Sequence, residues 1–342
     1  MPPAANEQVL LVARPQGVPR LDDFAFASAP RPDPADGQFL VRAEFLSADP
    51  LQRWRMAGAA TYGNTIGLGE LVWGRMVGQV VASRHPQWRE GDRAEGMLGW
   101  QSYALSRGET SKAAYAPGVT RVDPANGPVS LALGILGMPG LTAYCAMLDI
   151  CRPSAGETIV VSGAAGTVGS LAGQIAKIHG CRVVGIAGGA DKCRHVVDDL
   201  GFDAAVDYRD GGDLQQALRA ACPDGIHAYY DNVGGAVADA VYPLLARHAR
   251  VAVVGRVSQM TSPAPRIDLQ EYMISSRLRV QGFVVYDHEH RADEARDAIA
   301  GWVRSGRVRY FETVHRGIRS APQALIDVIE GRGRGKHVIA ME

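Results

Sequence analysis

The chain has 342 residues, enough for two domains, and its composition of 46% hydrophobic and 21% charged residues is typical of a globular protein. Its 36 Lys and Arg residues balance 36 Asp and Glu residues, so the formal net charge at pH 7 is zero. This balance provides no electrostatic basis for binding nucleic acid or an anionic membrane. The N-terminal residues MPPAANEQ have neither a basic flank nor an apolar core, so we expect no signal peptide.

The first third of the chain contains short apolar runs at 8–15, 38–46 and 74–83, separated by Gly, Pro and Asp. Alternating apolar residues between turn residues predict a strand-rich domain. Residues 55–70 are rich in glycine and show no periodicity, so we expect a long mobile loop there.

Residues 129–148 carry no charge, but Gly134, Gly137, Pro139 and Gly140 interrupt them. Because a Pro-Gly pair is typical of turns, we expect the start of a buried helix rather than a membrane span. The five cysteines form no CxxC pair, and such an odd, scattered set indicates reduced thiols and a cytoplasmic protein; they are Cys145, Cys151, Cys181, Cys193 and Cys222.

From about residue 154 the pattern changes to alternating strands and helices. Strand-like runs at 158–163, 181–188, 204–208, 228–234 and 250–256 alternate with helix-like segments at 167–179, 191–200, 213–221 and 236–247. This repeated βα pattern predicts an α/β fold with a doubly wound parallel sheet and right-handed crossovers. Two further helices are expected at 291–305 and 321–330, followed by a last strand at 335–341.

The sequence GAAGTVG at 163–169 joins the first strand of this series to its helix. Gly166 would let the backbone approach a pyrophosphate, and Gly169 would let the helix pack close to the strand. The helix N-terminus would supply free N–H groups for the phosphates. Ala164 stands where the first glycine of such a motif is usual. A strand–helix turn without a ligand is the alternative, but the βα alternation favours a dinucleotide site.

The end of the second strand indicates which nucleotide would bind. An NAD site usually carries an acidic residue there, but this chain has Ala187, Gly188 and Gly189, followed by Lys192. Tyr208 ends the next strand, and a cation with a phenol hydroxyl suits a 2′-phosphate. NADP is therefore favoured over NAD, although a carboxylate, Asp191, lies beside Lys192.

The stretch 133–208, beginning LGILGMPGLTAYC and ending GFDAAVDY, resembles the medium-chain dehydrogenase/reductase superfamily. Together with LGELVWGRMVGQVVAS (68–83), YYDNVGG (229–235), GFVVYDH (282–288) and GKHVIAM (335–341), it resembles the zinc-independent alkenal/one oxidoreductase branch. That branch includes prostaglandin reductases, plant double-bond reductases and bacterial curcumin reductases. The resemblance covers nearly the whole chain.

This resemblance implies a GroES-like catalytic domain at 1–128, a Rossmann NADP-binding domain at 129–310 and a return to the catalytic domain at 311–342. It implies a homodimer in which NADPH and substrate meet in the cleft between the domains. The implied activity is reduction of the C=C bond of a small hydrophobic enone or enal. A hydride goes to the carbon β to the carbonyl, and the α carbon is then protonated.

The resemblance also implies roles for single residues. Gly166, Thr167 and Val168 match the pyrophosphate turn, while Lys192 and Tyr208 match the positions that hold the 2′-phosphate. The rest of the expected cofactor set consists of Gly169, Gly188, Asn232, Gly255 and the pair Phe283 and Val284, whose backbone would meet the nicotinamide. Tyr62 matches a tyrosine of the mobile substrate loop.

Three positions depart from the branch. Met260 replaces a tyrosine thought to stabilise the enolate, Leu51 replaces another tyrosine, and Gly333 replaces an asparagine that usually contacts the cofactor. Because a thioether donates no hydrogen bond, Tyr62 becomes the candidate catalytic residue, with Tyr286 as a weaker one. Half-buried packing is the alternative for both tyrosines.

The substrate pocket would contain Tyr62, Met260 and Tyr286. Trp54, Met56 and Trp73 would add apolar lining suited to bulky enones or quinones, but these three side chains suit an ordinary core equally well.

No catalytic zinc site is expected, because no Cys precedes Cys145 and the chain lacks a GHE run. Two alternatives remain open at this point. One is an NADPH quinone reductase, and the other is an NADPH-binding sensor without catalysis.

Overall fold

The computed structural model describes residues 5–58, 65–108, 118–260 and 268–341. The chain forms two compact units, one of residues 1–134 with 312–342 and one of residues 135–311. Residues 129–134, which the sequence assigned to the Rossmann domain, belong to the first unit in this division.

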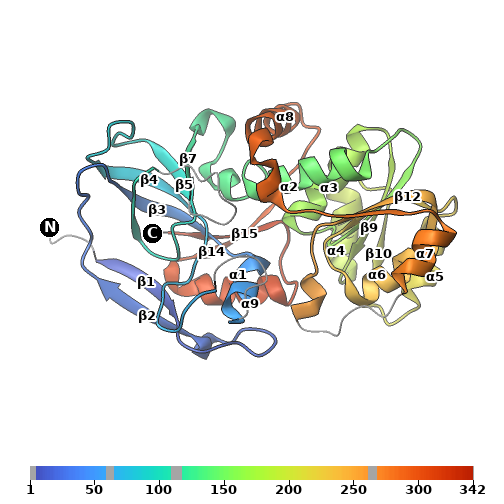
Figure 1. The fold of residues 1–342 in the computed structure, drawn as a ribbon, viewed down its shortest axis with the longest axis horizontal. Helices are drawn as coiled ribbons and strands as arrows, with labels where there is room; N and C mark the ends of the chain where they lie inside the picture. The colour runs from blue at the N-terminus through green and yellow to red at the C-terminus, as the bar shows by residue number, and fades with distance from the viewer. Residues whose placement is uncertain (1–4, 59–64, 109–117, 261–267, 342) are drawn as a thin grey trace. The chain divides into compact units, whose positions relative to one another are not determined.

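The first unit is built on a seven-stranded sheet, as expected for a strand-rich domain (Figure 1). Its order is β14 (Glu312–Arg316), β15 (Lys336–Ala340), β3 (Phe39–Ser47), β4 (Met76–Ser83), β5 (Arg93–Gly96) and β7 (Val119–Val122), with β6 (Tyr103–Ser106) paired to β3. Only β14 and β15 pair in parallel. A separate antiparallel pair consists of β1 (Asn6–Leu11) and β2 (Phe24–Ala29).

Two helices accompany these strands, α1 (Pro50–Met56) and α9 (Ala321–Ile329). Helix α1 begins at Pro50 after a capping box between Asp49 and Gln52. The loop predicted to begin at residue 55 therefore begins later, because the last turn of α1 includes Arg55 and Met56. Short 3₁₀ turns lie at Leu21–Asp23, Pro124–Asn126, Val129–Leu133 and Ile318–Ser320.

The second unit contains a six-stranded sheet in which every pair is parallel. The spatial order is β10 (Ala204–Asp207), β9 (Arg182–Ala187), β8 (Thr158–Ser162), β11 (Ile226–Asp231), β12 (Leu245–Val253) and β13 (Arg279–Gly282). Counted within this unit, the order is 3-2-1-4-5-6, which is that of a Rossmann sheet with its switch point between β8 and β11. The predicted doubly wound fold is confirmed.

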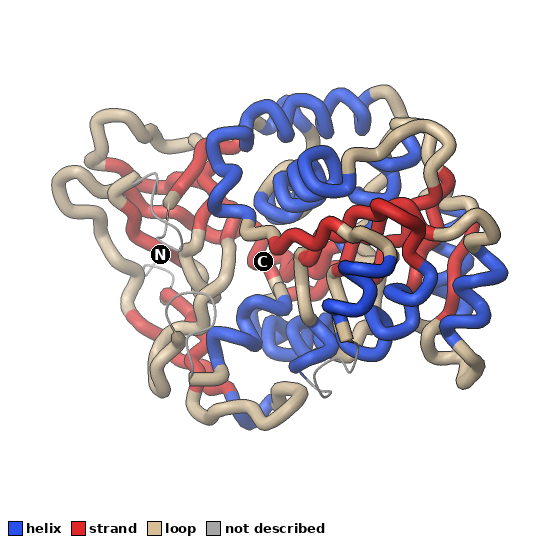
Figure 2. The backbone as a smooth tube through the Cα atoms, turned by 45° about the vertical axis from the view of Figure 1, so that its right-hand side comes forward, coloured by secondary structure: helices blue, strands red, loops and turns tan. Residues whose placement is uncertain are grey.

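Helices flank both faces of this sheet (Figures 1 and 2). On one side lie α2 (Met138–Cys145), α3 (Thr167–Ile178) and α8 (Ala292–Arg304), and on the other lie α5 (Leu214–Ala221) and α6 (Gly235–Val241). The remaining helical segments are η4 (Ala146–Cys151), α4 (Ala190–Arg194), η5 (His195–Asp199), η6 (Tyr242–Leu244), η7 (Val257–Met260), α7 (Leu269–Ser275) and η8 (Val285–Arg291).

The helix expected over 236–247 is wrong at its C-terminal end. Helix α6 stops at Val241, and β12 already begins at Leu245. The cause is a long-range pairing, since Leu245 lies opposite Ile226 of β11 in the parallel ladder. Local periodicity carries no information about such a partner.

The charge-free stretch 129–148 is divided between a 3₁₀ turn, α2 and the start of η4. Among the described residues, no helix is both long enough and apolar enough to cross a membrane. The five cysteines are all free thiols, and only Cys193 is more than marginally exposed.

Candidate cofactor site

The second unit carries a row of glycines and polar residues at the carboxyl edge of its parallel sheet. Each strand of the sheet is followed, within two residues, by a residue expected to bind the cofactor or by the first residue of the pyrophosphate turn. In chain order, from β8 to β13, these residues are Gly163, Gly188, Tyr208, Asn232, Gly255 and Phe283. In doubly wound folds, ligands bind outside this edge at the switch point. These residues are spread over about a third of the chain, and the sheet topology brings them to one edge.

The turn from β8 to α3 has the geometry of an anion site. Gly163 adopts a φ of +63°, and Gly166 is the N-cap of α3 with no side chain bonded to the first turn. The backbone N–H groups of Thr167 and Val168 thus have no side-chain cap, and the helix dipole adds positive potential. This arrangement fits a pyrophosphate group.

Close packing explains two glycines here and the departure at Ala164. A Cβ atom at Gly169 would lie 2.3 Å from the carbonyl oxygen of Gly163, so only glycine allows α3 to approach the turn this closely. Ala164 is completely buried, and a Cβ at Gly185 of β9 would lie 2.8 Å from its methyl group. Gly185 therefore makes the space that an alanine at position 164 requires.

Asn232 is held rigidly at the switch point. Its backbone N–H donates to Oγ of Ser162 at 3.0 Å, and its Nδ2 donates to the Ser162 carbonyl at 2.8 Å. Beside it, Oδ1 of Asp231 accepts from Tyr229 Oη at 2.8 Å and from the backbone N–H groups of Val233 and Gly234 at 3.0 and 2.8 Å. Burial raises the pKa of Asp231 despite these bonds.

The ends of β9 and β10 are tied together by Asp207. Its Oδ1 accepts from the backbone N–H groups of Gly189 and Arg209, at 2.8 and 2.9 Å. Helix α4 follows with Lys192, while Asp191, whose carboxylate complicated the choice of nucleotide, forms an ion pair with Arg194. Asp191 thus has a cationic partner on its own helix, although both side chains are exposed to solvent.

Arg209 is a residue that the sequence reasoning missed. Its Nε donates to Oη of Tyr208 at 3.1 Å, and its guanidinium carbon lies 5.3 Å from the centre of that ring. A Cβ at Gly188 would lie 2.9 Å from both Nε of Arg209 and Cε1 of Tyr208. The sequence could have indicated Arg209, because it is a cation that directly follows Tyr208 at the end of a predicted strand.

The other expected residues extend this edge. A Cβ at Gly255 would lie 2.6 Å from the carbonyl oxygen of Asn232, so glycine is required where β12 ends beside β11. The N–H of Phe283 donates to the Val253 carbonyl at 3.0 Å, and Val284 precedes η8. Phe283 is 8% exposed, and its ring stacks on His288 with centroids 4.7 Å apart.

The chain is similar to two family models and to several known proteins. Residues 7–113 match a family model described as the N-terminal domain of oxidoreductase, and residues 167–301 match one described as zinc-binding dehydrogenase. The NADPH-dependent curcumin reductase of Escherichia coli is 41% identical, with 98% of this chain and 96% of that protein covered. The chain is a medium-chain dehydrogenase/reductase. Its likeness to prostaglandin and alkenal reductases places it in the zinc-independent branch.

Two further relatives support this placement. The NADP⁺-dependent 2-alkenal reductase of Nicotiana tabacum is 34% identical, with 98% of this chain and 97% of that protein covered. The structure of CurA from Vibrio vulnificus in complex with NADPH is similar at a TM-score of 0.91 and 39% identity, covering 98% of this chain and 99% of that one. The family expected from the motifs is confirmed, as is the GroES-like plus Rossmann fold class.

The residues expected in the substrate pocket are distributed as follows. Tyr62 lies outside the described residues. Met260 ends η7 and is 8% exposed, and Tyr286 lies half-buried in η8. Met56 is fully buried in the core of the first unit, so for it the core interpretation holds. Trp73 is partly buried against that core and Trp54 is partly buried in α1, so both interpretations stay open for these two.

One departure from the family pattern has a local explanation. Gly333, at the family's asparagine position, has a φ of +69°, and a Cβ there would lie 2.6 Å from Nε2 of His337. His337 is buried, so the ring fills the volume that a side chain at position 333 would need.

Proposed function

We propose that this reductase uses NADPH to reduce the C=C bond of α,β-unsaturated aldehydes and ketones without a catalytic zinc ion. The hydride is delivered to the carbon β to the carbonyl, and the α carbon is protonated. The observation that supports this most strongly is the full-length similarity to a curcumin reductase and an alkenal reductase, both named for NADPH or NADP⁺ dependence.

The residues at the sheet edge suit NADP(H). The uncapped first turn of α3 would hold the pyrophosphate through the backbone N–H groups of Thr167 and Val168. Lys192, Tyr208 and Arg209 would bind the 2′-phosphate, because Lys192 lies in α4, directly after β9, and Tyr208 and Arg209 directly follow β10. No carboxylate ends β9, whose last residue is Ala187.

Asn232, Gly255 and the Phe283–Val284 segment would line the nicotinamide half of the cofactor. Their backbone is fixed by the bonds from Asn232 to Ser162 and from Phe283 to Val253. A fixed wall of this kind orients the ring that supplies the hydride when the cofactor is bound.

The protein must also stabilise the negative charge that develops on the substrate carbonyl oxygen. Met260 offers no donor, so we assign this hydrogen bond to Tyr62. Removal of one such donor costs on the order of 10²-fold in kcat. Tyr62→Phe removes only the hydroxyl and should lower kcat/KM on an enone by about that factor. Tyr286→Phe removes the hydroxyl of the weaker candidate in the same way, and a larger loss in that variant would assign the hydrogen bond to Tyr286 instead.

The deciding measurement is NADPH oxidation with purified protein against a panel of enones, enals and quinones, with NADH as the cofactor control. Fast turnover of enones, with loss of the C=C bond verified by product analysis, would support the proposal. Turnover of quinones alone would favour a quinone reductase. Tight NADPH binding with no turnover across the panel would favour the sensor.

Assembly and location are part of the same proposal. We infer a homodimer in the cytoplasm from the family resemblance and from the five free thiols. Sedimentation at micromolar concentration distinguishes a dimer from a monomer, and cell fractionation tests the compartment.

A further inference from the structure

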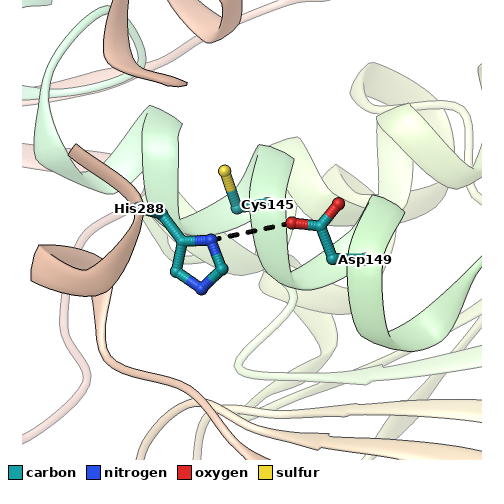
Figure 3. A group of neighbouring side chains, drawn as sticks. All are labelled: Cys145, Asp149 and His288. Atoms are coloured by element: carbon teal, nitrogen blue, oxygen red, sulfur yellow. Dashed lines mark ion pairs between the residues drawn. The ribbon is translucent and has the colours of Figure 1, made fainter. Parts of the chain in front are cut away.

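A group of potential metal ligands lies in the second unit, outside the residues assigned to the cofactor (Figure 3). Cys145 ends α2, Asp149 lies one turn further along in η4, and His288 comes from η8. One ligand atom from each residue lies within 4.8 Å of the others. Figure 3 shows His288 facing Asp149 across the marked ion pair, with the side chain of Cys145 beside them.

The chemistry of these donors is mixed and specific. A thiol sulfur, an imidazole nitrogen and a carboxylate oxygen are together the ligand set of borderline metals such as Zn²⁺, and unsuited to Mg²⁺ or Ca²⁺. We propose that Cys145, Asp149 and His288 form a binding site for one zinc-class divalent ion, with the fourth position open to water. This site differs from the catalytic zinc site of zinc alcohol dehydrogenases, which the sequence does not predict in this chain.

The distances require only a small adjustment. Ligand atoms around a tetrahedral zinc ion lie about 3.3–3.8 Å apart, given bond lengths near 2.0–2.3 Å. Nδ1 of His288 and Oδ2 of Asp149 are already 3.7 Å apart. The sulfur of Cys145 would therefore have to approach by at most about 1.5 Å, which is within the reach of a side-chain rotation.

The surrounding charges are compatible with a dication. Nη1 of Arg291 contacts both carboxylate oxygens of Asp149 at 2.7 Å, and the other guanidinium nitrogens contact Glu294 at 2.6 and 2.9 Å. One guanidinium between two carboxylates leaves one negative charge in the group. Because a single nitrogen takes both oxygens of Asp149, the outer edges of that carboxylate remain open to a metal.

Exposure allows an ion to enter. The side chain of Asp149 is 37% exposed and that of His288 is 22% exposed, while Cys145 is completely buried. Metal binding would replace the thiol proton of Cys145, which passes to solvent, and no group is oxidised or reduced. The bound ion, thiolate and carboxylate then sum to zero charge.

Such an ion would connect two parts of the fold. Cys145 ends α2 and Asp149 lies in η4, which follows it directly, whereas His288 lies in η8 and stacks on Phe283. Fixing His288 would therefore brace the segment around Phe283. Since a ligand bound only to the folded state stabilises it, metal binding should raise the melting temperature.

The test uses the full-length, tag-free protein, first stripped with a chelator. Titration with Co²⁺ should produce a thiolate-to-cobalt charge-transfer band that saturates at one equivalent, and Zn²⁺ should abolish it by competition. Zn²⁺ should also raise the melting temperature. Cys145→Ala, Asp149→Asn and His288→Gln should each weaken binding at least about tenfold, and the cysteine variant should lose the band.

Matched controls separate this site from adventitious binding. Cys193→Ser removes the most exposed thiol, and His290→Gln changes a histidine two residues from His288. Both should bind one equivalent like the parent protein. The proposal is overturned if no band forms, if the Cys145 variant keeps it, or if the two controls lose it. Circular dichroism of each variant shows whether it is folded, and the result does not depend on enzymatic activity.

Discussion

Gly169 of α3 lies so close to Gly163 that a Cβ atom would be 2.3 Å from the carbonyl oxygen of Gly163. At Gly166, three residues earlier, the nearest atom to a Cβ is the same oxygen at 3.3 Å. Gly169→Ala should therefore lower the melting temperature, by the equivalent of about 1–3 kcal/mol, and weaken NADPH binding because the helix must shift. Gly166→Ala is the control and should cost clearly less in stability. Thermal denaturation measures the stability and fluorescence titration measures NADPH binding, and equal losses of stability in the two variants would contradict the packing argument.

Cofactor choice gives the second prediction. Lys192→Ala and Arg209→Ala should each raise the KM for NADPH about tenfold, because a hydrogen bond to a charged group contributes roughly 1.5–3 kcal/mol. Their kcat/KM with NADH should remain unchanged, since NADH carries no 2′-phosphate. Arg219→Ala is the control, because Arg219 is an exposed cation of α5 outside the expected cofactor residues. Steady-state kinetics with NADPH and with NADH test this prediction. If kcat/KM with NADH fell as much as kcat/KM with NADPH in the Arg209 variant, Arg209 would act only on the fold.

The third prediction concerns Gly333, where the family pattern has asparagine. Gly333→Asn would restore that residue, but the new Cβ would lie 2.6 Å from His337 Nε2 and 2.7 Å from Thr313 Oγ1. We expect a lower melting temperature, by the equivalent of about 1–3 kcal/mol, and no gain in NADPH affinity. Gly317→Asn is the matched control, because Gly317 has a similar φ of +71° but no atom within 4 Å of its Cβ position. A stable Gly333→Asn variant with tighter NADPH binding would refute this account.

The sequence predicted the features that depend on local pattern. The strands from β8 to β12 were recognised because their apolar runs are bounded by turns, and the glycines at 166 and 169 because their spacing is tied to a strand–helix turn. Features that depend on distant partners were not predicted. Leu245 joins β12 only because it pairs with Ile226, and the space for Ala164 comes from Gly185 on the neighbouring strand. The group of Cys145, Asp149 and His288 spans more than a hundred residues, so no local pattern marks it.

The last prediction is a pH dependence of stability that originates at His337. Burial lowers the pKa of this imidazole to about 4, and the neighbouring His315 adds to the effect. In its neutral form His337 donates from Nε2 to the Arg332 carbonyl at 3.0 Å and accepts at Nδ1 from His315 Nε2 at 3.2 Å. Protonation of Nδ1 would remove this acceptor, so His315 would have to change its tautomer or oppose a second N–H group.

The direction of the change in stability depends on which state of the chain binds more protons. Between pH 6.5 and pH 4 the unfolded chain protonates this histidine while the folded chain does not, so stability falls as the pH falls through that window. A shift of this size corresponds to about 3 kcal/mol at 1.36 kcal/mol per pKa unit. The carboxylates of Glu157 and Asp203, whose pKa values are lowered, lose their contribution mainly below about pH 4.5. The melting temperature should therefore already decrease between pH 6.5 and 4.5, and His337→Asn should reduce that decrease, while His315, whose pKa burial also lowers, supplies the remainder. An identical decrease in the variant would show that His337 is not its source.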